Sequence, residues 1–394
     1  MERRLNLAVI GVGGRGKEVL GGAFVENVVA IADVDEDFLR KAALRCCGET
    51  KLYNDYRRLL EENHTRLDGV VVNTPDHTHF PISMLAMEYG LHVYCEKPLA
   101  HSVRECRLMA EKAREKKVIT QTGMQMHALE NYRRVVEMIQ SGAIGTVSEV
   151  HVWCGKGWGG NDVRPAETQE PPRNLHWDLW LGNAPRRPYH SQCYHPANWR
   201  RWWDFGSGTL GDMGCHYMDL AFWALNLDAP KTIRATGPSL ETQTEMAPLR
   251  LRVDYVFPTP QEEIQLTWYD GDETPEVLVK NQLPLWLGGV LFVGSRGMLL
   301  ADYTHRILLP EADFANYEPP TATIPPSPGH LKEWLQGIRT QEEPSCHFGY
   351  TGRLTEAVLL GVVAYRCGET LHWDAAAGKV IGNERAQKLV EDER

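Results

Sequence analysis

The sequence lacks any apolar run that could cross a membrane, and it lacks an excess of positive charge. Its 394 residues include 42 lysines and arginines against 52 aspartates and glutamates, a formal net charge of −10 at pH 7. No apolar stretch approaches the roughly 18 residues that a membrane-spanning helix requires. A negatively charged protein is also poorly suited to a nucleic acid or an anionic membrane surface. We therefore expect a small-molecule partner, with neither nucleic acid nor membrane.

The sequence also lacks the cysteine and histidine spacings of a metal site. Its nine cysteines are an odd number without a metal-ligand spacing, and His190, Cys193 and His195 have no convincing second ligand pair. We expect no metal and mostly reduced thiols, which favours a cytoplasmic protein. The start of the chain passes directly into a strand pattern at Leu5–Ile10, which leaves no room for a secretory signal. A chain already trimmed of such a signal would look the same.

What the first part of the chain does have is an alternation of short apolar runs with helix-like segments. Strands are predicted at Leu5–Ile10, Val28–Ala32, Gly69–Asn73, Leu91–Cys95 and Val118–Thr122. Helical patterns lie between them, at Asp35–Arg45, Tyr56–Asn63, Pro81–Tyr89 and Ser102–Lys116. Such alternation predicts an α/β domain over residues 1–125, with a parallel sheet covered by helices on both faces.

The pattern changes after residue 125. Strands at hairpin-like spacing are predicted at Leu249–Phe257, Glu262–Trp268, Val290–Val293 and Met298–Ala301, after an earlier strand over residues 145–153. Residues 126–394 are therefore predicted to form an α+β domain with a mostly antiparallel sheet. An irregular stretch over residues 156–205 is too long for a simple connector and holds six tryptophans. We expect it to form a packed wall or lid over a pocket.

A glycine-rich turn follows the first predicted strand. Gly11, Gly13 and Gly16 fit the pattern G-x-G-x-x-G, whose glycines allow a dinucleotide pyrophosphate to approach the backbone at the start of a helix. The second predicted strand leads to Asp33, 17 residues after Gly16, where an acid can bind a ribose diol and repel a 2′-phosphate. With Asp35 nearby rather than a basic residue, NAD is favoured over NADP. The alternative is a structural glycine turn followed by a surface aspartate.

Polar residues also follow the third predicted strand. Asn73 and Thr74 precede Pro75, which directs the chain over the sheet edge, toward the crevice where such sheets bind ligands. Contact with the nucleotide is one interpretation. A capped loop that starts the next helix, with Asp76 or Thr78 as the cap, is equally consistent with the pattern.

Three further residues form a candidate catalytic group. Lys97 stands between Glu96 and Pro98 at the carboxyl end of a buried strand. Asp212 and His216 are four residues apart and share a helix face if the segment is helical. Near the positive end of a helix dipole His216 would be neutral and able to accept a proton. The alternative makes Asp212 a helix cap and His216 a core residue.

These motifs resemble the Gfo/Idh/MocA oxidoreductase family, which includes glucose–fructose oxidoreductase and inositol dehydrogenase. The resemblance covers nearly the whole chain. It rests on the glycine turn, Asn73-Thr74-Pro75 with His79, Glu96-Lys97-Pro98, Gly123-Met124-Gln125, Asp212 with His216, and Leu359–Ala364 with Trp373-Asp374.

The resemblance implies a Rossmann domain that binds NAD, followed by an α+β domain whose large, open, mostly antiparallel sheet mediates homodimers or homotetramers. It implies that Lys97, Asp212 and His216 are catalytic and that the Lys97–Pro98 peptide is cis. The residues expected to contact the cofactor are Gly11, Val12, Gly13, Gly14, Arg15, Gly16, Asp33, Asn73, Thr74, Pro75, His79, Glu96, Lys97 and Gln125.

The expected function is NAD-dependent transfer of hydride to or from a hydroxyl carbon of a sugar or cyclitol. Aromatic side chains stack on the C–H faces of carbohydrates, so Tyr194, His195, Trp199 and Arg200 are the predicted substrate contacts, with domain packing as the alternative. A second hypothesis is a redox-neutral glycosidase that keeps NAD tightly bound and acts by transient sugar oxidation and elimination. A third is a nucleotide-sensing or structural protein without turnover, although the catalytic group argues against it.

Overall fold

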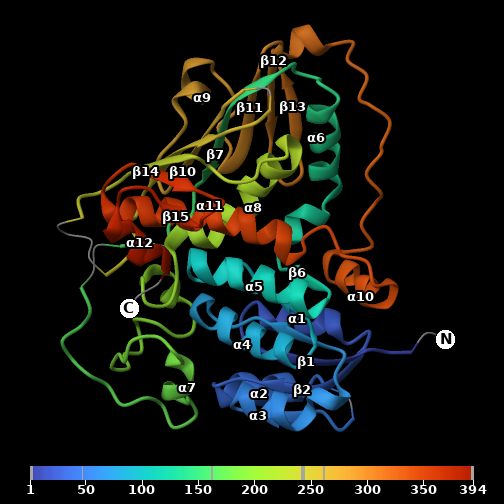
Figure 1. Cartoon of the computed structure of the whole chain (residues 1–394), viewed down its shortest axis with the longest axis vertical. Helices are drawn as coiled ribbons and strands as arrows, with labels where there is room; N and C mark the ends of the chain where they lie inside the picture. Colours follow the sequence, from blue (N-terminus) through green and yellow to red (C-terminus); the bar gives the residue numbers. More distant parts are fainter. Residues whose placement is uncertain (1–2, 47, 161–162, 241–244, 261, 392–394) are drawn as a thin grey trace.

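The computed structural model describes residues 3–46, 48–160, 163–240, 245–260 and 262–391. Figure 1 shows two layers, with the amino-terminal α/β domain at the bottom and the strands of the second sheet at the top. Helices α8 (Gly208–Leu225) and α11 (Phe348–Cys367) lie between them. No described helix is both long enough and apolar enough to cross a membrane.

The first domain has a six-stranded sheet in the order β3-β2-β1-β4-β5-β6, and every pair of neighbours is parallel. The strands are β1 (Asn6–Ile10), β2 (Asn27–Ala32), β3 (Lys51–Tyr53), β4 (Gly69–Val72), β5 (His92–Cys95) and β6 (Thr120–Thr122). The helices are α1 (Gly16–Ala23), α2 (Glu36–Ala43), α3 (Tyr56–Asn63), α4 (Asp76–Glu88) and α5 (Val103–Lys116). The predicted Rossmann architecture is confirmed. Strand order reverses between β1 and β4, the position at which such sheets bind ligands.

The second sheet has nine strands in the order β13-β12-β11-β7-β10-β9-β8-β14-β15. Its neighbours are antiparallel, except that β10 and β7 run parallel. The strands are β7 (Val147–Cys154), β8 (Thr232–Thr236), β9 (Arg252–Phe257), β10 (Ile264–Asp270), β11 (Gly288–Gly294), β12 (Gly297–Ala301), β13 (Arg306–Leu309), β14 (Leu371–Asp374) and β15 (Lys379–Val380). The expectation of a large, mostly antiparallel sheet is confirmed.

Alternation along the strands gives the second sheet two apolar faces. Val290 and Phe292 of β11 pack in the main core with α8 and α11, whereas Leu291 packs on the opposite face with Leu278. The other elements of this domain are α6 (Glu130–Gln140), α7 (Trp177–Leu181), α9 (Glu276–Lys280), α10 (His330–Thr340), α12 (Glu384–Glu391) and the short 3₁₀ turns η2 (Gln125–Ala128), η3 (Asn198–Arg201) and η4 (Glu311–Phe314). A further 3₁₀ turn, η1 (His64–Arg66), lies in the first domain.

The two domains share their cores. Arg107 of α5 donates two hydrogen bonds to Glu356 of α11, at 2.7 and 2.9 Å. Helix α10 returns from the second half of the chain to lie beside α1 (Figure 1). Its Trp334 is fully buried against the first sheet, and the indole donates a hydrogen bond to Ile119 O at 3.3 Å. The amino-terminal sheet therefore depends on a helix from the carboxyl-terminal half.

The described part of the irregular stretch over residues 156–205 is packed, as expected. It has its own apolar cluster of buried aromatic side chains, which includes Trp177, Trp180, Tyr194, Trp199, Trp202 and Phe205. The stretch is fastened to the first domain where α2 begins. His176 N donates to Val34 O at 2.9 Å, and Leu175 forms a β-bridge with Asp35. It is thus a wall held by both domains, and we call it the aromatic wall.

Removal of the Trp334 side chain tests the role of α10. The Trp334→Ala variant should lose about 3–5 kcal/mol of unfolding free energy, because the indole leaves a cavity against the first sheet. Urea denaturation followed by circular dichroism measures the change. Lys332 lies on the exposed face of the same helix. The unfolding free energy of Lys332→Ala should therefore stay within about 0.5 kcal/mol of the wild-type value. Equal stability of the two variants would contradict the assigned packing.

Candidate functional site

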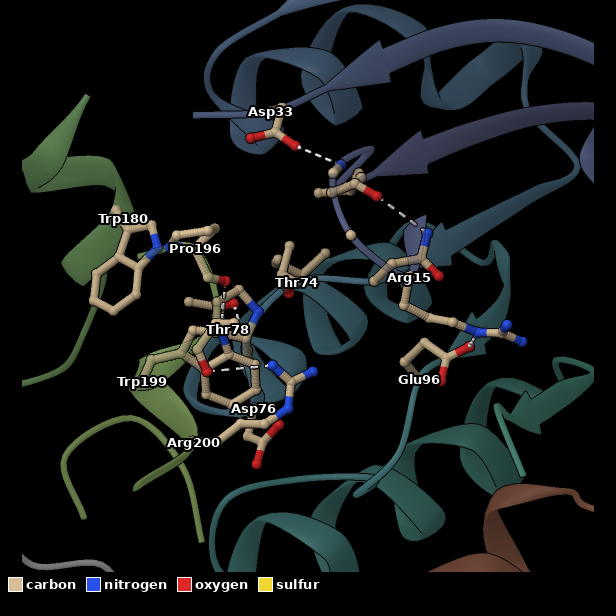
Figure 2. Close-up of a pocket in the computed structure, with 18 of the residues that line it drawn as sticks. Arg15, Asp33, Thr74, Asp76, Thr78, Glu96, Trp180, Pro196, Trp199 and Arg200 are labelled. Carbon is tan, nitrogen blue, oxygen red and sulfur yellow. Dashed lines mark hydrogen bonds and ion pairs between the residues drawn. The ribbon is translucent and has the colours of Figure 1, made fainter. Parts of the chain in front are cut away.

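A cavity of about 640 Å³ lies where the carboxyl ends of β1, β2, β4 and β5 meet the aromatic wall and α8. Glycine-turn residues line one part of it, and Lys97, Asp212 and His216 line another. Figure 2 shows Asp33 and Arg15 reaching it from the Rossmann domain, and Trp180, Trp199 and Arg200 from the wall. The topology therefore brings both predicted groups of residues to one cavity.

The glycine turn needs its glycines. A Cβ at Gly11, where φ is +80°, would lie 2.8 Å from the backbone of Asn73, and a Cβ at Gly16 would collide with Gly11 O. The Asp33 carboxylate accepts hydrogen bonds from Val12 N at 2.8 Å and Gly13 N at 3.2 Å. The turn is thus a close-packed backbone cradle at the amino end of α1, which suits a dinucleotide pyrophosphate.

Asp33 supports the turn in addition to lining the cavity. A third hydrogen bond reaches its other oxygen from Asp35 N at 2.9 Å. Burial raises the pKa of Asp33, while hydrogen bonds from Asp35 N and Val12 N oppose that rise. Among the described residues, Oδ1 of Asp33 accepts a hydrogen bond only from Asp35 N, so it still has accepting capacity for a ribose hydroxyl. The Asp33 carboxylate therefore fits the ribose of the nucleotide expected at this place.

The Asn73–Pro75 turn is braced from beneath. Asn73 donates a side-chain hydrogen bond to Gly11 O at 3.2 Å. The ring nitrogens of His79 lie 2.8 Å from Pro98 O and 2.7 Å from Thr74 O. His79 is 1% exposed and does not line the cavity. The structure thus places His79 as a brace between two loops and outside the cavity. The sequence analysis had predicted that it contacts the nucleotide.

Glu96 joins the glycine turn to the segment after β6. The buried carboxylate accepts hydrogen bonds from Arg15 Nε at 3.3 Å and from Gln125 Nε2 at 3.0 Å. Burial raises the pKa of Glu96, and the positive charges of Arg15 and Lys97 oppose that rise. Arg15, Glu96 and Gln125 all line the cavity. The cavity is also lined by other predicted cofactor contacts, namely Gly11, Gly13, Gly14, Asp33, Asn73, Thr74, Pro75 and Lys97. Val12 and Gly16 do not line it.

Lys97 connects the two domains. The Lys97–Pro98 peptide is cis, as the family resemblance implies. Lys97 Nζ donates hydrogen bonds to Asp212 O at 2.6 Å and to Asp212 Oδ1 at 2.7 Å. Arg200 Nε and Trp158 Nε1 donate to the same carboxylate, at 3.2 and 2.8 Å. Burial alone would raise the pKa of Asp212, but Lys97 and Arg200 hold that pKa well below its usual range.

His216 lies one turn further along α8 and is neutral. Its pKa is lowered by burial first and by the charge of Lys97 second. Its Nδ1 has no hydrogen-bond partner among the described residues. Helix α8 begins at Gly208, with Ser207 at the N-cap position, so Asp212 is not its cap. His216 is the ninth residue of α8 and lies beyond the first turn, in which the helix dipole acts, so burial and Lys97 account for the uncharged imidazole.

The four predicted substrate contacts separate into two groups. Trp199 and Arg200 line the cavity, with the Arg200 guanidinium 4.4 Å from the Trp199 ring centroid. His195 also lines it, but at the nucleotide end, where Nε2 lies 2.9 Å from Asp35 Oδ2. Tyr194 does not line it. Its ring is buried in the aromatic cluster and its hydroxyl accepts from Arg164, so Tyr194 is a packing residue, which corrects its predicted place in the pocket.

Several lining residues escaped the sequence analysis. Trp158 contacts Asp212, although its tryptophan-rich stretch gave only a general signal of a pocket wall. Tyr303, which follows β12, also lines the cavity, and no sequence pattern pointed to it. Asp76 was considered as a nucleotide contact or a helix cap, and α4 has Pro75 at its N-cap position. No cluster of three or more potential metal ligands occurs among the described residues.

Comparison with known families gives two matches along the chain. Residues 5–124 match an oxidoreductase family described as having an NAD-binding Rossmann fold, and residues 130–261 match the carboxyl-terminal α/β domain of the same oxidoreductase family. The two matches follow the order of the domains in the structure.

Curated relatives are similar over part of their length. Inositol 2-dehydrogenase 1 of Saccharopolyspora erythraea is 30% identical over 152 residues, which cover 37% of this chain and 44% of that protein. A 2,7-anhydro-N-acetylneuraminate hydratase of Mediterraneibacter gnavus is 31% identical over 38% of this chain and 39% of that protein. The matches thus span less than half of these relatives.

Solved structures are similar over nearly the whole chain. A WlbA dehydrogenase from Bordetella pertussis, in complex with NADH and UDP-GlcNAcA, has a TM-score of 0.67 at 16% identity and covers 94% of this chain and 99% of that one. An aldose-aldose oxidoreductase from Caulobacter crescentus has a TM-score of 0.63 at 16% identity, over 94% of this chain and 100% of that one. At this identity the likeness shows the fold.

Filling the glycine cradle tests the nucleotide site. Gly16→Ala should weaken NADH binding by at least about 100-fold, since the new Cβ displaces Gly11 O and with it the turn. Titration of NADH fluorescence measures the affinity. Gly21→Ala, in the same helix and outside the cavity, serves as the control and should bind NADH like the wild type. NADH affinity unchanged in Gly16→Ala would place the nucleotide elsewhere.

Proposed function

Because this chain belongs to the Gfo/Idh/MocA family of NAD-binding oxidoreductases, we propose that it transfers hydride between NAD and a hydroxyl-bearing carbon of a sugar or cyclitol. The observation that carries the proposal is Lys97 Nζ, held at 2.6 and 2.7 Å by Asp212 in the cavity that contains the glycine cradle. Relatives named as inositol dehydrogenases support a polyol substrate.

The Rossmann residues would hold the cofactor. Because Val12 N and Gly13 N donate to Asp33, the amino end of α1 would hold the pyrophosphate, and Asp33 would accept from the ribose hydroxyls. Glu96, with Gln125 and Arg15 bound to it, borders the same cavity and would position the nicotinamide end. When bound, NAD supplies the hydride acceptor.

The residues around Lys97 would handle the substrate hydroxyl. A neutral His216 can accept the hydroxyl proton as hydride leaves. The Lys97 ammonium would donate a hydrogen bond to the same oxygen while negative charge develops there. Asp212 fixes Lys97 through two contacts, and Arg200 and Trp158 fix Asp212. Trp199 offers an aromatic face for the carbohydrate, and His195 would act at the nucleotide end.

A redox-neutral reaction with retained NAD is the second candidate. A relative named as a 2,7-anhydro-N-acetylneuraminate hydratase favours it, because hydration involves no net oxidation. So does the aromatic wall, which lines the cavity from His195 at the nucleotide end to Arg200 beside Asp212 and would slow cofactor exchange. Release of p-nitrophenol from p-nitrophenyl glycosides without accumulation of NADH would support this candidate, whereas stoichiometric NADH from a free sugar or cyclitol would support the dehydrogenase.

We also propose a cytoplasmic homodimer or homotetramer joined through the nine-stranded sheet. The support is a group of exposed apolar residues on and after α9, with Val279 62%, Leu285 67% and Leu287 89% exposed. They adjoin the face of the sheet that holds Leu278 and Leu291. Light scattering of the purified protein gives the oligomer size, and a monomer at micromolar concentration would refute the assembly.

Replacement of Lys97 tests the reaction directly. Lys97→Ala should lower kcat by at least about 100-fold, as expected for loss of a donor to a developing oxyanion, and should leave NADH affinity within about threefold. A panel of myo-inositol, D-glucose and levoglucosan with NAD provides the assay, read by nicotinamide absorbance. Lys116→Ala, on the first domain and outside the cavity, is the matched control. Wild-type turnover in Lys97→Ala would remove Lys97 from the mechanism.

A further inference from the structure

Asp76 is a buried carboxyl group that faces the cavity without a hydrogen bond from any other described residue. It is the first residue of α4, is 4% exposed and lines the cavity. Within the described part of the chain, only its own backbone N–H donates to its carboxyl group. Figure 2 shows Asp76 near Arg200 at the end of the pocket away from Asp33. Buried carboxyl groups normally have partners, so this one calls for an explanation.

The cations nearest to Asp76 bind its neighbour Asp212. Arg200 and Lys97 provide the positive charges that act on Asp76 most strongly. Lys97 Nζ and Arg200 Nε donate to one oxygen of Asp212, Trp158 donates to the other, and Arg200 Nη1 donates to Ala197 O at 3.4 Å. Asp212 therefore has three side-chain donors, whereas Asp76 has no donor among the described residues except its own backbone N–H. A molecule bound in the cavity could supply the hydrogen-bond partner that Asp76 lacks.

We propose that Asp76 is a substrate-contacting residue, whose carboxyl group carries a proton and donates it in a hydrogen bond to an oxygen of the bound sugar or cyclitol. This inference rests on the proposed function and deepens it. A carboxylic acid donates one hydrogen bond and accepts another, which matches a hydroxyl group on the substrate. Asp76 would thereby fix the orientation of the ring that Lys97 and His216 act upon.

The surroundings of Asp76 favour its protonated form. Burial raises the pKa of Asp76 to about 8, Arg200 and Lys97 oppose the rise, and Asp212 adds to it. Two thiols also interact with it, those of Cys95 on β5 and Cys215 on α8. Both thiols are buried and their pKa values are raised, so neither supplies a charge near neutral pH.

The first test needs no substrate. Between about pH 4 and pH 8 the folded protein keeps the Asp76 proton, whereas the unfolded chain has lost it, so wild-type stability falls as pH rises over this interval. Asparagine does not titrate. The melting temperature of Asp76→Asn minus that of the wild type should therefore increase from pH 5 to pH 8 and then level off. A difference that is constant with pH would show that Asp76 is ionised and would overturn the proposal.

The second test uses the alcohol of the panel that the wild type oxidises fastest. Asp76→Asn keeps a neutral donor, so its kcat/KM at pH 7 should stay within about fivefold of the wild type. The kcat/KM of the wild type should decline above about pH 8 as Asp76 ionises, and that of Asp76→Asn should not. Asp76→Leu has a similar shape without a donor and should raise KM by about 10- to 100-fold. Asp37→Asn, an exposed acid in the first turn of α2, controls for loss of an acid near a helix start.

Two results would overturn the substrate contact. In one, Asp76→Asn loses as much activity as Asp76→Leu, which would make the carboxylate the active form. In the other, Asp76→Leu keeps the wild-type KM, which would show that the side chain does not touch the substrate. If the wild type oxidises no alcohol of the panel, the proposed function fails instead, and the melting experiment still tests the protonation of Asp76.

Discussion

The hydrogen-bonded ion pair between Lys97 and Asp212 holds the candidate site together. The two residues are 115 positions apart, and their side chains are each 12% exposed. Such a buried pair overcomes its desolvation cost only with good geometry and additional hydrogen bonds. Here Arg200 and Trp158 donate the additional hydrogen bonds to Asp212. The Rossmann domain, α8 and the aromatic wall therefore all meet at one carboxylate.

Burial determines the charge of two other groups of the cavity. It disfavours the charged form of any side chain, so it lowers the pKa of His216 and raises that of Asp76. Both remain neutral near pH 7, whereas Lys97 and Arg200 hold the pKa of Asp212 well below its usual range. A neutral imidazole can accept a proton and a neutral carboxyl group can donate one. The same dry cavity thus provides opposite proton roles at two positions.

Sequence reasoning succeeded where local pattern and topology coincide. The alternation of strands and helices led to the Rossmann sheet, and the glycine turn with Asp33 and the position of Lys97 followed from strand ends. It missed β3, whose three residues at the sheet edge are largely exposed and have no apolar pattern. It misplaced Tyr194, because an aromatic ring can serve a pocket or a core equally well. Asp76 escaped because the start of a helix has an ordinary explanation for an aspartate.

The aromatic wall links the nucleotide end of the cavity to the reacting end. His195 contacts Asp35 beside the nucleotide site, and five residues later Arg200 contacts Asp212. Both belong to one segment with a common aromatic core. The same packed segment therefore contacts the acid beside the nucleotide site and the carboxylate that holds Lys97. A change in its packing at either end would act, through that core, on both groups.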